Sequence, residues 1–350
     1  MSKRLVESTI DQGMHRFLAD GVHYRDLMDI RSATPDWSRW CQEWSRVAAD
    51  AEARGEKALA DGLRETAARE FARAALYFHY GQYLLYDDMR TKRATHDRKV
   101  AAFHRAAPLF DMPLERVNIP FDGISMAGYF RLPRNPDKPP CVILLGGLDT
   151  TKEDYLTVND LCVQRGLATL SFDGPGQGET QFQSLWRRDF ERAVTAVVDF
   201  LQTRAEIHHD RIGIIGRSMG GYYAPMAAAV DSRVHAIVSW GAMYHLRNLE
   251  SVPQHIRDGF IYVADAKNAK DALEFFECIN LEGHAAKIRC PMLVVHGGLD
   301  NITPMENATR LVAETQGKVE TLIWEDSIHC CHDRSHIVRP AMADFMLKNL

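Results

Sequence analysis

The sequence has no apolar run long enough to cross a membrane and no marked excess of one charge sign. Its longest apolar runs fall well short of the ~20 residues that a transmembrane helix needs. Lysine and arginine number 42 against 47 aspartate and glutamate residues, which leaves a formal net charge of -5. Because a nucleic-acid-binding surface is strongly basic, this balance argues against DNA or RNA as a partner. We therefore expect a small-molecule substrate, with neither a nucleic acid nor a membrane as partner.

Cysteine is scarce and irregularly placed. The seven cysteines are odd in number and scattered along the chain, which excludes an ordinary disulfide framework. Cys330 and Cys331 stand near His329 and His332, but no C-x-x-C partner accompanies them, so we expect no metal and no other cofactor. The first seven residues carry positive charge without the apolar stretch of a secretion signal, which predicts a cytoplasmic location.

The chain contains two parts with different hydrophobic patterns. Residues 1–112 have almost no strand pattern, and apolar residues recur at helical spacing over 43–63 and 65–86, which predicts an all-helical N-terminal or cap domain. One aromatic band in it is too wide for the buried stripe of a single helix. We expect this band to pack against other helices, against another domain, or against a second copy in a homodimer, and a direct role in lining a substrate pocket is the alternative. The band consists of Leu76, Tyr77, Phe78, Tyr80, Tyr83, Leu84 and Tyr86.

Residues 113–350 show short β-branched runs separated by amphipathic helices. A hairpin around Asp122-Gly123 precedes runs that read as buried strands. Strands that alternate with helices predict an α/β fold with a mostly parallel, doubly wound sheet, here opened by an antiparallel hairpin. The segment of about 244–285 is predicted to form a cap-like insertion. The apolar runs are 141–145, 168–172, 212–215, 236–240, 292–295 and 321–324.

The most informative motif is Gly216-Arg217-Ser218-Met219-Gly220, which follows an apolar run directly and precedes a helix rich in small residues. A strand, a sharp turn and a helix in this order are typical of a nucleophile elbow, whose serine presents its hydroxyl at the apex of the turn. The five-residue pattern alone would occur by chance in roughly one chain in ten of this length. The strand before it and the helix after it make Ser218 a candidate nucleophile.

A serine nucleophile needs a histidine to accept its proton and a carboxylate to orient that histidine. Ser218, Asp300 and His329 follow the order nucleophile, acid, base, and each comes directly after a predicted strand. Asp326 is the alternative acid, but it precedes His329 by only three residues, which makes a strain-free contact harder. His332 is the alternative base, and we favour His329 because it follows its strand sooner.

An oxyanion hole requires two backbone N–H donors. One is predicted at Met219, directly after the serine, and the other at Leu148, in the Gly146-Gly147-Leu148 loop that follows the run 141–145. Arg217 beside the serine has two interpretations. It binds a carboxylate or enolate of the substrate, or it makes a structural ion pair, which is the more common role of an arginine in such a position.

With these motifs, residues 116–350 resemble the α/β-hydrolase superfamily. The helical first half and the stretches 145–152 and 173–179 make the whole chain similar to the branch of 2,6-dihydroxypseudooxynicotine hydrolase-like enzymes and fermentation-respiration switch protein-like esterases. This resemblance implies an α/β-hydrolase fold, a homodimer and a Ser-Asp-His triad.

The resemblance also implies an additional glutamate near the substrate pocket. Glu250 is the one acidic residue between Arg233 and Arg257, in the segment where that glutamate would be needed. The assignment depends on this position alone. A solvated glutamate on a cap helix is an equally good interpretation.

The activity implied by the resemblance is hydrolysis of a carbon–carbon bond in a 1,3-dicarbonyl type of small molecule, as in aromatic or alkaloid catabolism or polyketide chain shortening. An acyl-enzyme on Ser218 is expected, and direct attack by a water activated by His329 is the alternative. A carboxylesterase or lactonase is the nearest competing function, because the same triad serves both reactions. A binding protein that keeps the hydrolase fold without activity is the third.

Overall fold

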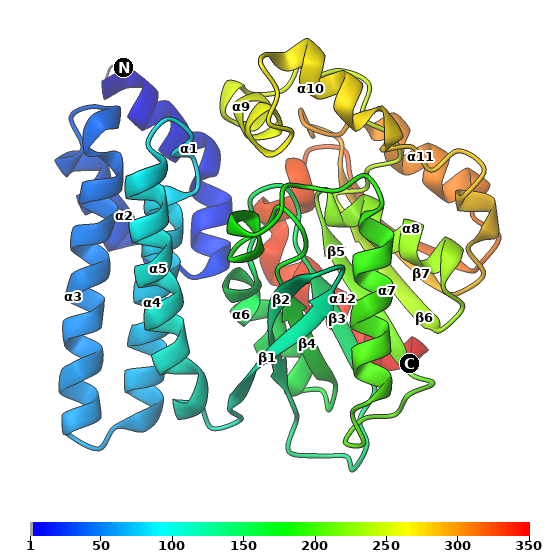
Figure 1. Ribbon diagram of the computed structural model, residues 1–350, viewed down its shortest axis with the longest axis horizontal. Coiled ribbons are helices and arrows are strands. Elements are labelled where there is room, and N and C mark those ends of the chain that lie inside the picture. The colour runs from blue at the N-terminus through cyan, green and yellow to red at the C-terminus, as the bar shows by residue number, and fades with distance from the viewer. Residues whose placement is uncertain (1–2) are drawn as a thin grey trace. The chain divides into compact units, whose positions relative to one another are not determined.

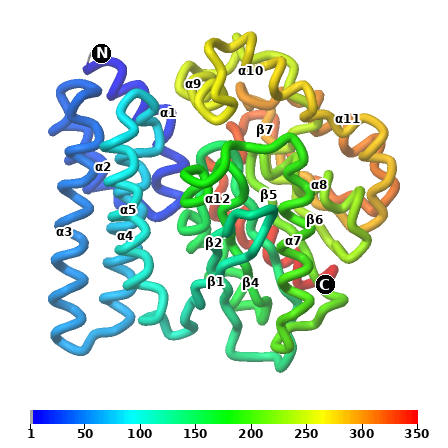
Figure 2. Tube along the Cα trace, viewed as in Figure 1, coloured from blue at the N-terminus to red at the C-terminus, as the bar shows by residue number. Residues whose placement is uncertain are grey.

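The computed structural model describes residues 3–350 (Figures 1 and 2). The chain divides into two compact units, one ending at Arg116 and the other running from Val117 to Leu350. Among the described residues, no helix is both long and apolar enough to span a bilayer.

The first unit is built from helices. Figure 1 shows α3, α4 and α5 side by side, and the α3–α4 pair covers most of the ranges 43–63 and 65–86 in which helices were predicted. Local capping contributes at α5, where the Asp88 carboxylate accepts a hydrogen bond from the Thr91 N–H at 3.0 Å. The helices are α1 (Lys3–Asp20), α2 (Tyr24–Ala33), α3 (Trp40–Ala60), α4 (Arg64–Gln82) and α5 (Met89–Ala106), with short 3₁₀ turns at Trp37–Arg39 and Ala107–Leu109.

The predicted aromatic band lies mostly in the interior. Tyr77 and Tyr80 of α4 are fully buried, and their hydroxyls donate hydrogen bonds of 2.6 Å to the carboxylates of Asp26 and Asp20. The Tyr80 ring packs edge-on against Phe17 of α1. Because these rings are buried within one chain, an exposed aromatic surface no longer argues for a homodimer, and the dimer stays a prediction.

The second unit is built on an eight-stranded sheet with the order β1-β2-β4-β3-β5-β6-β7-β8. β2 pairs antiparallel with β4, and every pair from β4 to β8 is parallel. The predicted fold class is therefore confirmed, down to the antiparallel strands at one edge. The strands are β1 (Leu114–Phe121), β2 (Ile124–Arg131), β3 (Cys141–Leu145), β4 (Ala168–Phe172), β5 (Ile212–Arg217), β6 (Val234–Trp240), β7 (Met292–Gly297) and β8 (Val319–Trp324).

Helices cover both faces of this sheet, because its central strands are apolar on both sides. Alternate residues of β3 divide between two cores. Ile143 belongs to the core that also contains residues of α7 (Phe190–Gln202), α8 (Gly220–Val230) and α11 (Met305–Glu314). Leu144 belongs to the other core, with α6 (Leu156–Val163) and α12 (Ser335–Asn349). Because helices cover both faces, functional groups are expected at the carboxyl ends of the parallel strands, where they gather in such folds.

The segment between β6 and β7 carries two further helices, α9 (Gln254–Val263) and α10 (Ala269–Phe275). Figure 1 shows them, in yellow, above the upper ends of the strands. The segment reaches the start of α8, where the Tyr222 hydroxyl donates a hydrogen bond of 3.2 Å to the Cys278 carbonyl. It therefore lies beside the strand–helix turn that carries Ser218.

Candidate active site

Ser218 occupies a strained turn between β5 and α8. Its φ of 59° lies in the left-handed region that side chains rarely adopt, and such strain is typical of functional positions. The turn needs glycine at position 216, because a Cβ there would lie 1.9 Å from the Gly220 carbonyl oxygen. The Ser218 N–H donates a hydrogen bond of 2.7 Å to the Trp240 carbonyl at the end of β6. The geometry is that of the predicted elbow.

Three predicted side chains from separate strand ends meet at this turn. The Ser218 hydroxyl lies 2.9 Å from Nε2 of His329, and Nδ1 of His329 lies 2.6 Å from Oδ2 of Asp300. Asp300 is buried and also accepts hydrogen bonds from the Ile302 and Thr303 N–H groups and from the Thr303 hydroxyl. The carboxylate is therefore fixed from its own loop, and it holds the histidine so that Nε2 faces the serine.

The two charged partners shift each other's protonation. Burial alone would lower the pKa of His329, but the Asp300 carboxylate outweighs it and holds this pKa well above the ordinary value of histidine. Burial alone would raise the pKa of Asp300, but His329 and the hydrogen bonds of the loop hold it well below its usual range. Asp300 is an anion at neutral pH, ready to stabilise an imidazolium at His329.

The alternative acid and base lie elsewhere. Asp326 is 75% exposed and pairs with Arg334 at 2.6 Å. His332 is buried with its ring edge-on to Trp240, at 5.6 Å between ring centroids. His296 lies behind Asp300, where its Nε2 is 2.9 Å from the Thr303 carbonyl and helps to hold the loop that carries the carboxylate.

Trp240 joins the serine turn to the histidine loop, a role that the sequence did not indicate. Its carbonyl accepts from the Ser218 N–H and from the Cys330 thiol, and its indole N–H donates to the Cys330 carbonyl. Cys330 and Cys331, directly after His329, both have positive φ, at 58° and 48°. The backbone that follows the histidine is thus strained and held to the same residue that holds the serine.

The two predicted oxyanion donors lie close together. A Cβ added to Gly147 would lie 3.0 Å from Ser218 Cβ and 3.2 Å from the Met219 nitrogen, so the loop after β3 passes directly over the elbow. Within residues 3–350, neither the Leu148 N–H nor the Met219 N–H has a hydrogen-bond acceptor. Two unused donors beside a candidate nucleophile are the arrangement that an oxyanion hole requires.

The other two predicted site residues are placed differently. Arg217 is buried, donates to the Thr150 hydroxyl at 2.9 Å, and lies over the rings of Tyr155 and Trp240. These contacts favour a structural role for Arg217 over contact with a substrate. Glu250 is 76% exposed and pairs with Arg257 at 3.2 Å. In the described part of the chain, no hydrogen bond links Glu250 to Ser218, Asp300 or His329, which matches the interpretation as a solvated glutamate.

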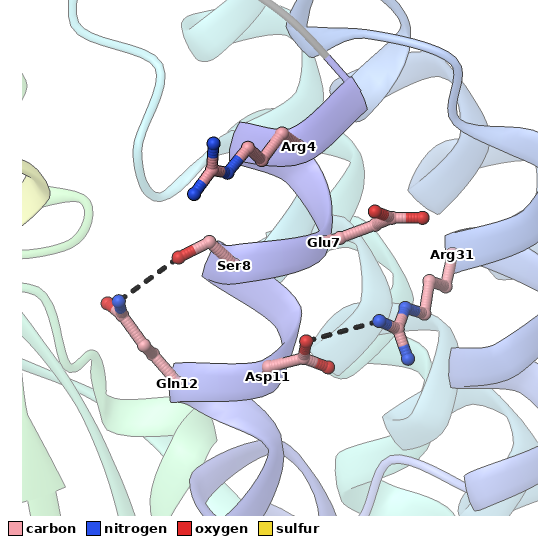
Figure 3. A pocket seen from close by; sticks show the side chains of 6 residues that line it. All are labelled: Arg4, Glu7, Ser8, Asp11, Gln12 and Arg31. Carbon is pink, nitrogen blue, oxygen red and sulfur yellow. Dashed lines mark hydrogen bonds and ion pairs between the residues drawn. The ribbon is translucent and has the colours of Figure 1, made fainter.

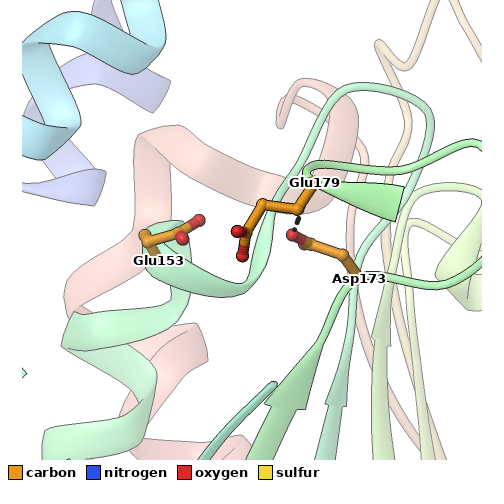
Figure 4. Close-up of side chains that lie close together, drawn as sticks. All are labelled: Glu153, Asp173 and Glu179. Atoms are coloured by element: carbon orange, nitrogen blue, oxygen red, sulfur yellow. Dashed lines mark hydrogen bonds between the residues drawn. The ribbon is translucent and has the colours of Figure 1, made fainter. Parts of the chain in front are cut away.

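Lys152, in the segment that follows β3, is a buried lysine surrounded by carboxylates. The Lys152 ammonium is 2.6 Å from Glu153, 2.7 Å from Asp173 and 2.8 Å from Glu179. Figure 4 shows these three acidic side chains pointing toward one another, with oxygens close enough together to hold a metal ion. Burial by itself lowers the pKa of Lys152, but the three carboxylates hold this pKa well above its ordinary value. The ammonium thus supplies the cation that the cluster needs.

Replacement of Lys152 by methionine should destabilise the protein by about 3–5 kcal/mol, because removing one partner leaves buried carboxylates uncompensated. Urea unfolding measures this. Lys318→Met is the control, because the Lys318–Glu320 pair is largely exposed. Equal unfolding midpoints for the two variants would contradict the expectation.

A shallow polar hollow occurs on the first unit. Its lining groups include two mutually bonded pairs, Arg31 with Asp11 and Gln12 with Ser8, both at 3.1 Å (Figure 3). Arg4 and Glu7 complete the lining. None of the residues of the Ser218 site belongs to it, so it adds nothing to the chemistry described above.

Comparison with known proteins finds relatives that are named hydrolases. The chain is 34% identical over 332 residues to 2,6-dihydropseudooxynicotine hydrolase of Paenarthrobacter nicotinovorans, covering 95% of this chain and 90% of that protein. It is 31% identical over 329 residues to 20-hydroxy-prefusarin hydrolase of Gibberella moniliformis, covering 80% of this chain and 78% of the relative. These relatives are named hydrolases, and the present chain is accordingly an enzyme of the hydrolase class.

A solved structure extends the likeness to three dimensions. The crystal structure of the 2,6-dihydroxy-pseudo-oxynicotine hydrolase superposes with a TM-score of 0.90 at 32% identity, covering 96% of this chain and 95% of the other. The fold is that of the α/β hydrolases, as the motifs predicted. Residues 24–328 match the family described as FrsA-like esterases. The chain therefore belongs to the FrsA-like esterase family.

Proposed function

We propose that the protein is a serine hydrolase in which Ser218 is the nucleophile, His329 the general base and Asp300 the residue that orients His329. The observation that carries the proposal is the unbroken hydrogen-bonded chain from the Ser218 hydroxyl through His329 to Asp300. The strained φ of Ser218 and the two unused N–H donors of Met219 and Leu148 support the same assignment.

The bond that we propose for cleavage is a carbon–carbon bond of a 1,3-dicarbonyl small molecule. Ser218 Oγ attacks one carbonyl carbon while His329 takes the hydroxyl proton, and the N–H groups of Met219 and Leu148 stabilise the oxyanion. Collapse of this intermediate breaks the bond to the central carbon, which leaves as an enolate because the second carbonyl accepts its electrons. The His329 imidazolium returns the proton to that carbon, and water then hydrolyses the acyl-enzyme.

His329 is better placed than Glu250 to protonate the leaving carbon. Glu250 is exposed and paired with Arg257, whereas His329 already lies against the serine oxygen. Similarity to a pseudooxynicotine hydrolase along nearly the whole chain supports the carbon–carbon reaction. A carboxylesterase or lactonase is the second candidate, favoured by the family to which the chain belongs.

Substrate panels distinguish the two candidates. Purified protein is assayed against aryl esters and against acylphenols and β-diketones, with Ser218→Ala as the control for each substrate. We expect the diketone or acylphenol panel to contain the better substrates and the control to be inactive on all of them. Strong ester turnover with none on any diketone would leave the esterase as the function, and turnover that survives in Ser218→Ala would contradict both candidates.

Three further expectations accompany this proposal. We propose that residues 1–112 form the helical N-terminal domain and 113–350 the catalytic domain, with a cap-like insertion at about 244–285. A homodimer and a cytoplasmic location also stay predictions. Light scattering on the purified protein measures the mass in solution and thus tests the dimer.

A further inference from the structure

Gln177 makes contacts that place it in the machinery around Ser218. Its side chain is 4% exposed and lies in the loop after β4. The Gly174 N–H donates to Gln177 Oε1 at 3.0 Å, so the oxygen of the amide faces Gly174 and the nitrogen faces the other way. That nitrogen donates to the carbonyls of Gly146 and Gly147, at 3.0 and 2.8 Å. One side chain therefore bridges two loops.

The bond to Gly147 determines the direction of a different group. The Gly147 carbonyl and the Leu148 N–H belong to one planar trans peptide, in which C=O and N–H point in opposite directions. A donor that fixes the carbonyl therefore also fixes the direction of the Leu148 N–H. This peptide is next to the elbow, because a Cβ at Gly147 would lie within 3.2 Å of both Ser218 Cβ and the Met219 nitrogen.

The same bond also makes the Leu148 N–H a better donor. A hydrogen bond accepted by a peptide carbonyl polarises the whole peptide and strengthens the bond that its N–H donates. Gly146 and Gly147 are buried, so water does not replace Gln177 as the donor to their carbonyls.

Gln177 is itself held rigidly from the other side. The Thr180 hydroxyl donates to the Asp173 carbonyl at 2.7 Å, and the Asp173 carboxylate accepts from the Lys152 and Glu179 N–H groups at 2.9 and 3.0 Å. These bonds fasten the loop after β4 to the loop after β3. Both the backbone that carries Gln177 and the carbonyls that its amide binds are thus held in place.

We infer that Gln177 is a positioning residue of the oxyanion site, which aims and polarises the Leu148 N–H at the carbonyl that Ser218 attacks. This inference rests on the proposed function, because it assigns a part of that same site. Loss of Gln177 should therefore weaken stabilisation of the transition state and leave substrate binding unchanged. Substrate binding needs no oxyanion, whereas the tetrahedral intermediate does.

The test compares Gln177→Met with Gln183→Met. Methionine keeps the length of glutamine but donates no hydrogen bond. Gln183 is the matched control, because its amide also exchanges two hydrogen bonds with backbone, those of Ser125 at 3.2 and 3.3 Å. The readouts are kcat, KM and the affinity for a trifluoromethyl ketone, whose adduct with the serine carries an oxyanion. Thermal melts fix a temperature at which every variant is folded.

We expect kcat of Gln177→Met to fall about 10- to 100-fold, part of the roughly 10²–10³-fold that loss of an oxyanion donor costs, with KM little changed. Affinity for the trifluoromethyl ketone should fall in parallel, and Gln183→Met should match the wild type in both. Gln177→Glu, whose carboxylate repels the two carbonyls, should lose at least as much. Gln177→Glu replaces Gln177→Met in the test if the methionine variant does not fold.

The outcomes separate this inference from the proposed function. Wild-type protein that neither turns over substrate nor reacts at Ser218 with a fluorophosphonate would remove the proposed function. An active wild type whose Gln177 variants keep the kcat and ketone affinity of Gln183→Met would overturn the positioning role alone. A rise in KM at constant kcat would also overturn it, because that result places Gln177 in substrate binding.

Discussion

Replacement of His329 by alanine is expected to lower kcat by about 10⁶-fold, the scale of loss seen when one member of a cooperating serine–histidine pair is removed. The reason is that, among residues 3–350, His329 Nε2 is the base that lies against the Ser218 hydroxyl, at 2.9 Å. Without it the serine proton has no acceptor at neutral pH. The measurement is steady-state turnover on the best substrate of the panels, with the thermal midpoint recorded for each variant.

His332→Ala is the matched control. His332 carries the same chemical group three residues later, but its ring packs on Trp240 behind the site rather than against the serine. Its loss should cost stability through a small cavity and leave most of the turnover in place. If His332→Ala lost the activity and His329→Ala kept it, the base would be His332, and the order of residues along the chain would have misled the assignment.

The fold and the positions of Ser218, Asp300 and His329 could be predicted because both depend on local sequence patterns. Buried parallel strands need short apolar runs, and six such runs between residues 141 and 324 became β3 to β8. An elbow needs glycines around its serine, and the acid and base follow strand ends. Ser218, Asp300 and His329 could therefore be located without knowing any contact between them.

The contacts between loops were not predictable, because they depend on which strand ends become neighbours. Gln177 and Gly147 are joined because β4 pairs with β3, and nothing in the apolar periodicity of either strand specifies the residue that bridges them. The Lys152 cluster has the same origin, since its carboxylates come from the loops after β3 and β4.

Glu250 is a residue that the sequence singled out but whose role the sequence could not decide. Its position in the sequence, in the segment after β6, suited an auxiliary catalytic acid and a solvated glutamate on a cap helix equally well. The structure gives it an exposed carboxylate and an arginine partner. Only the side-chain environment distinguishes a carboxylate that faces the reacting atoms from one that faces solvent, and the position of a residue in the sequence does not specify that environment.

Asp300→Asn is expected to lower kcat by about 10⁴-fold, because it reverses the tautomer of His329. The Ile302 and Thr303 N–H groups both donate to Asp300 Oδ1, so the amide oxygen of asparagine stays there and its NH₂ takes the place of Oδ2. That NH₂ faces Nδ1 of His329, which must then accept instead of donate. Nε2 consequently carries the proton and cannot take the one from Ser218.

The same substitution should move the acid limb of the pH profile to lower pH. Catalysis needs neutral His329, and in the wild type the Asp300 carboxylate holds the pKa of His329 well above its ordinary value, so activity should rise only above about pH 6.5. Asparagine removes that charge while burial, which lowers the pKa of His329, remains. The residual activity of Asp300→Asn should therefore persist to lower pH than that of the wild type.

Profiles of kcat/KM against pH test this, with Asp326→Asn as the control. Asp326 undergoes the same chemical change, but its exposed carboxylate pairs with Arg334, so both the rate and the acid limb should stay those of the wild type. An unchanged limb in Asp300→Asn would mean that Asp300 does not set the charge of His329. A shifted limb in Asp326→Asn would make Asp326 the acid, despite its position on the surface.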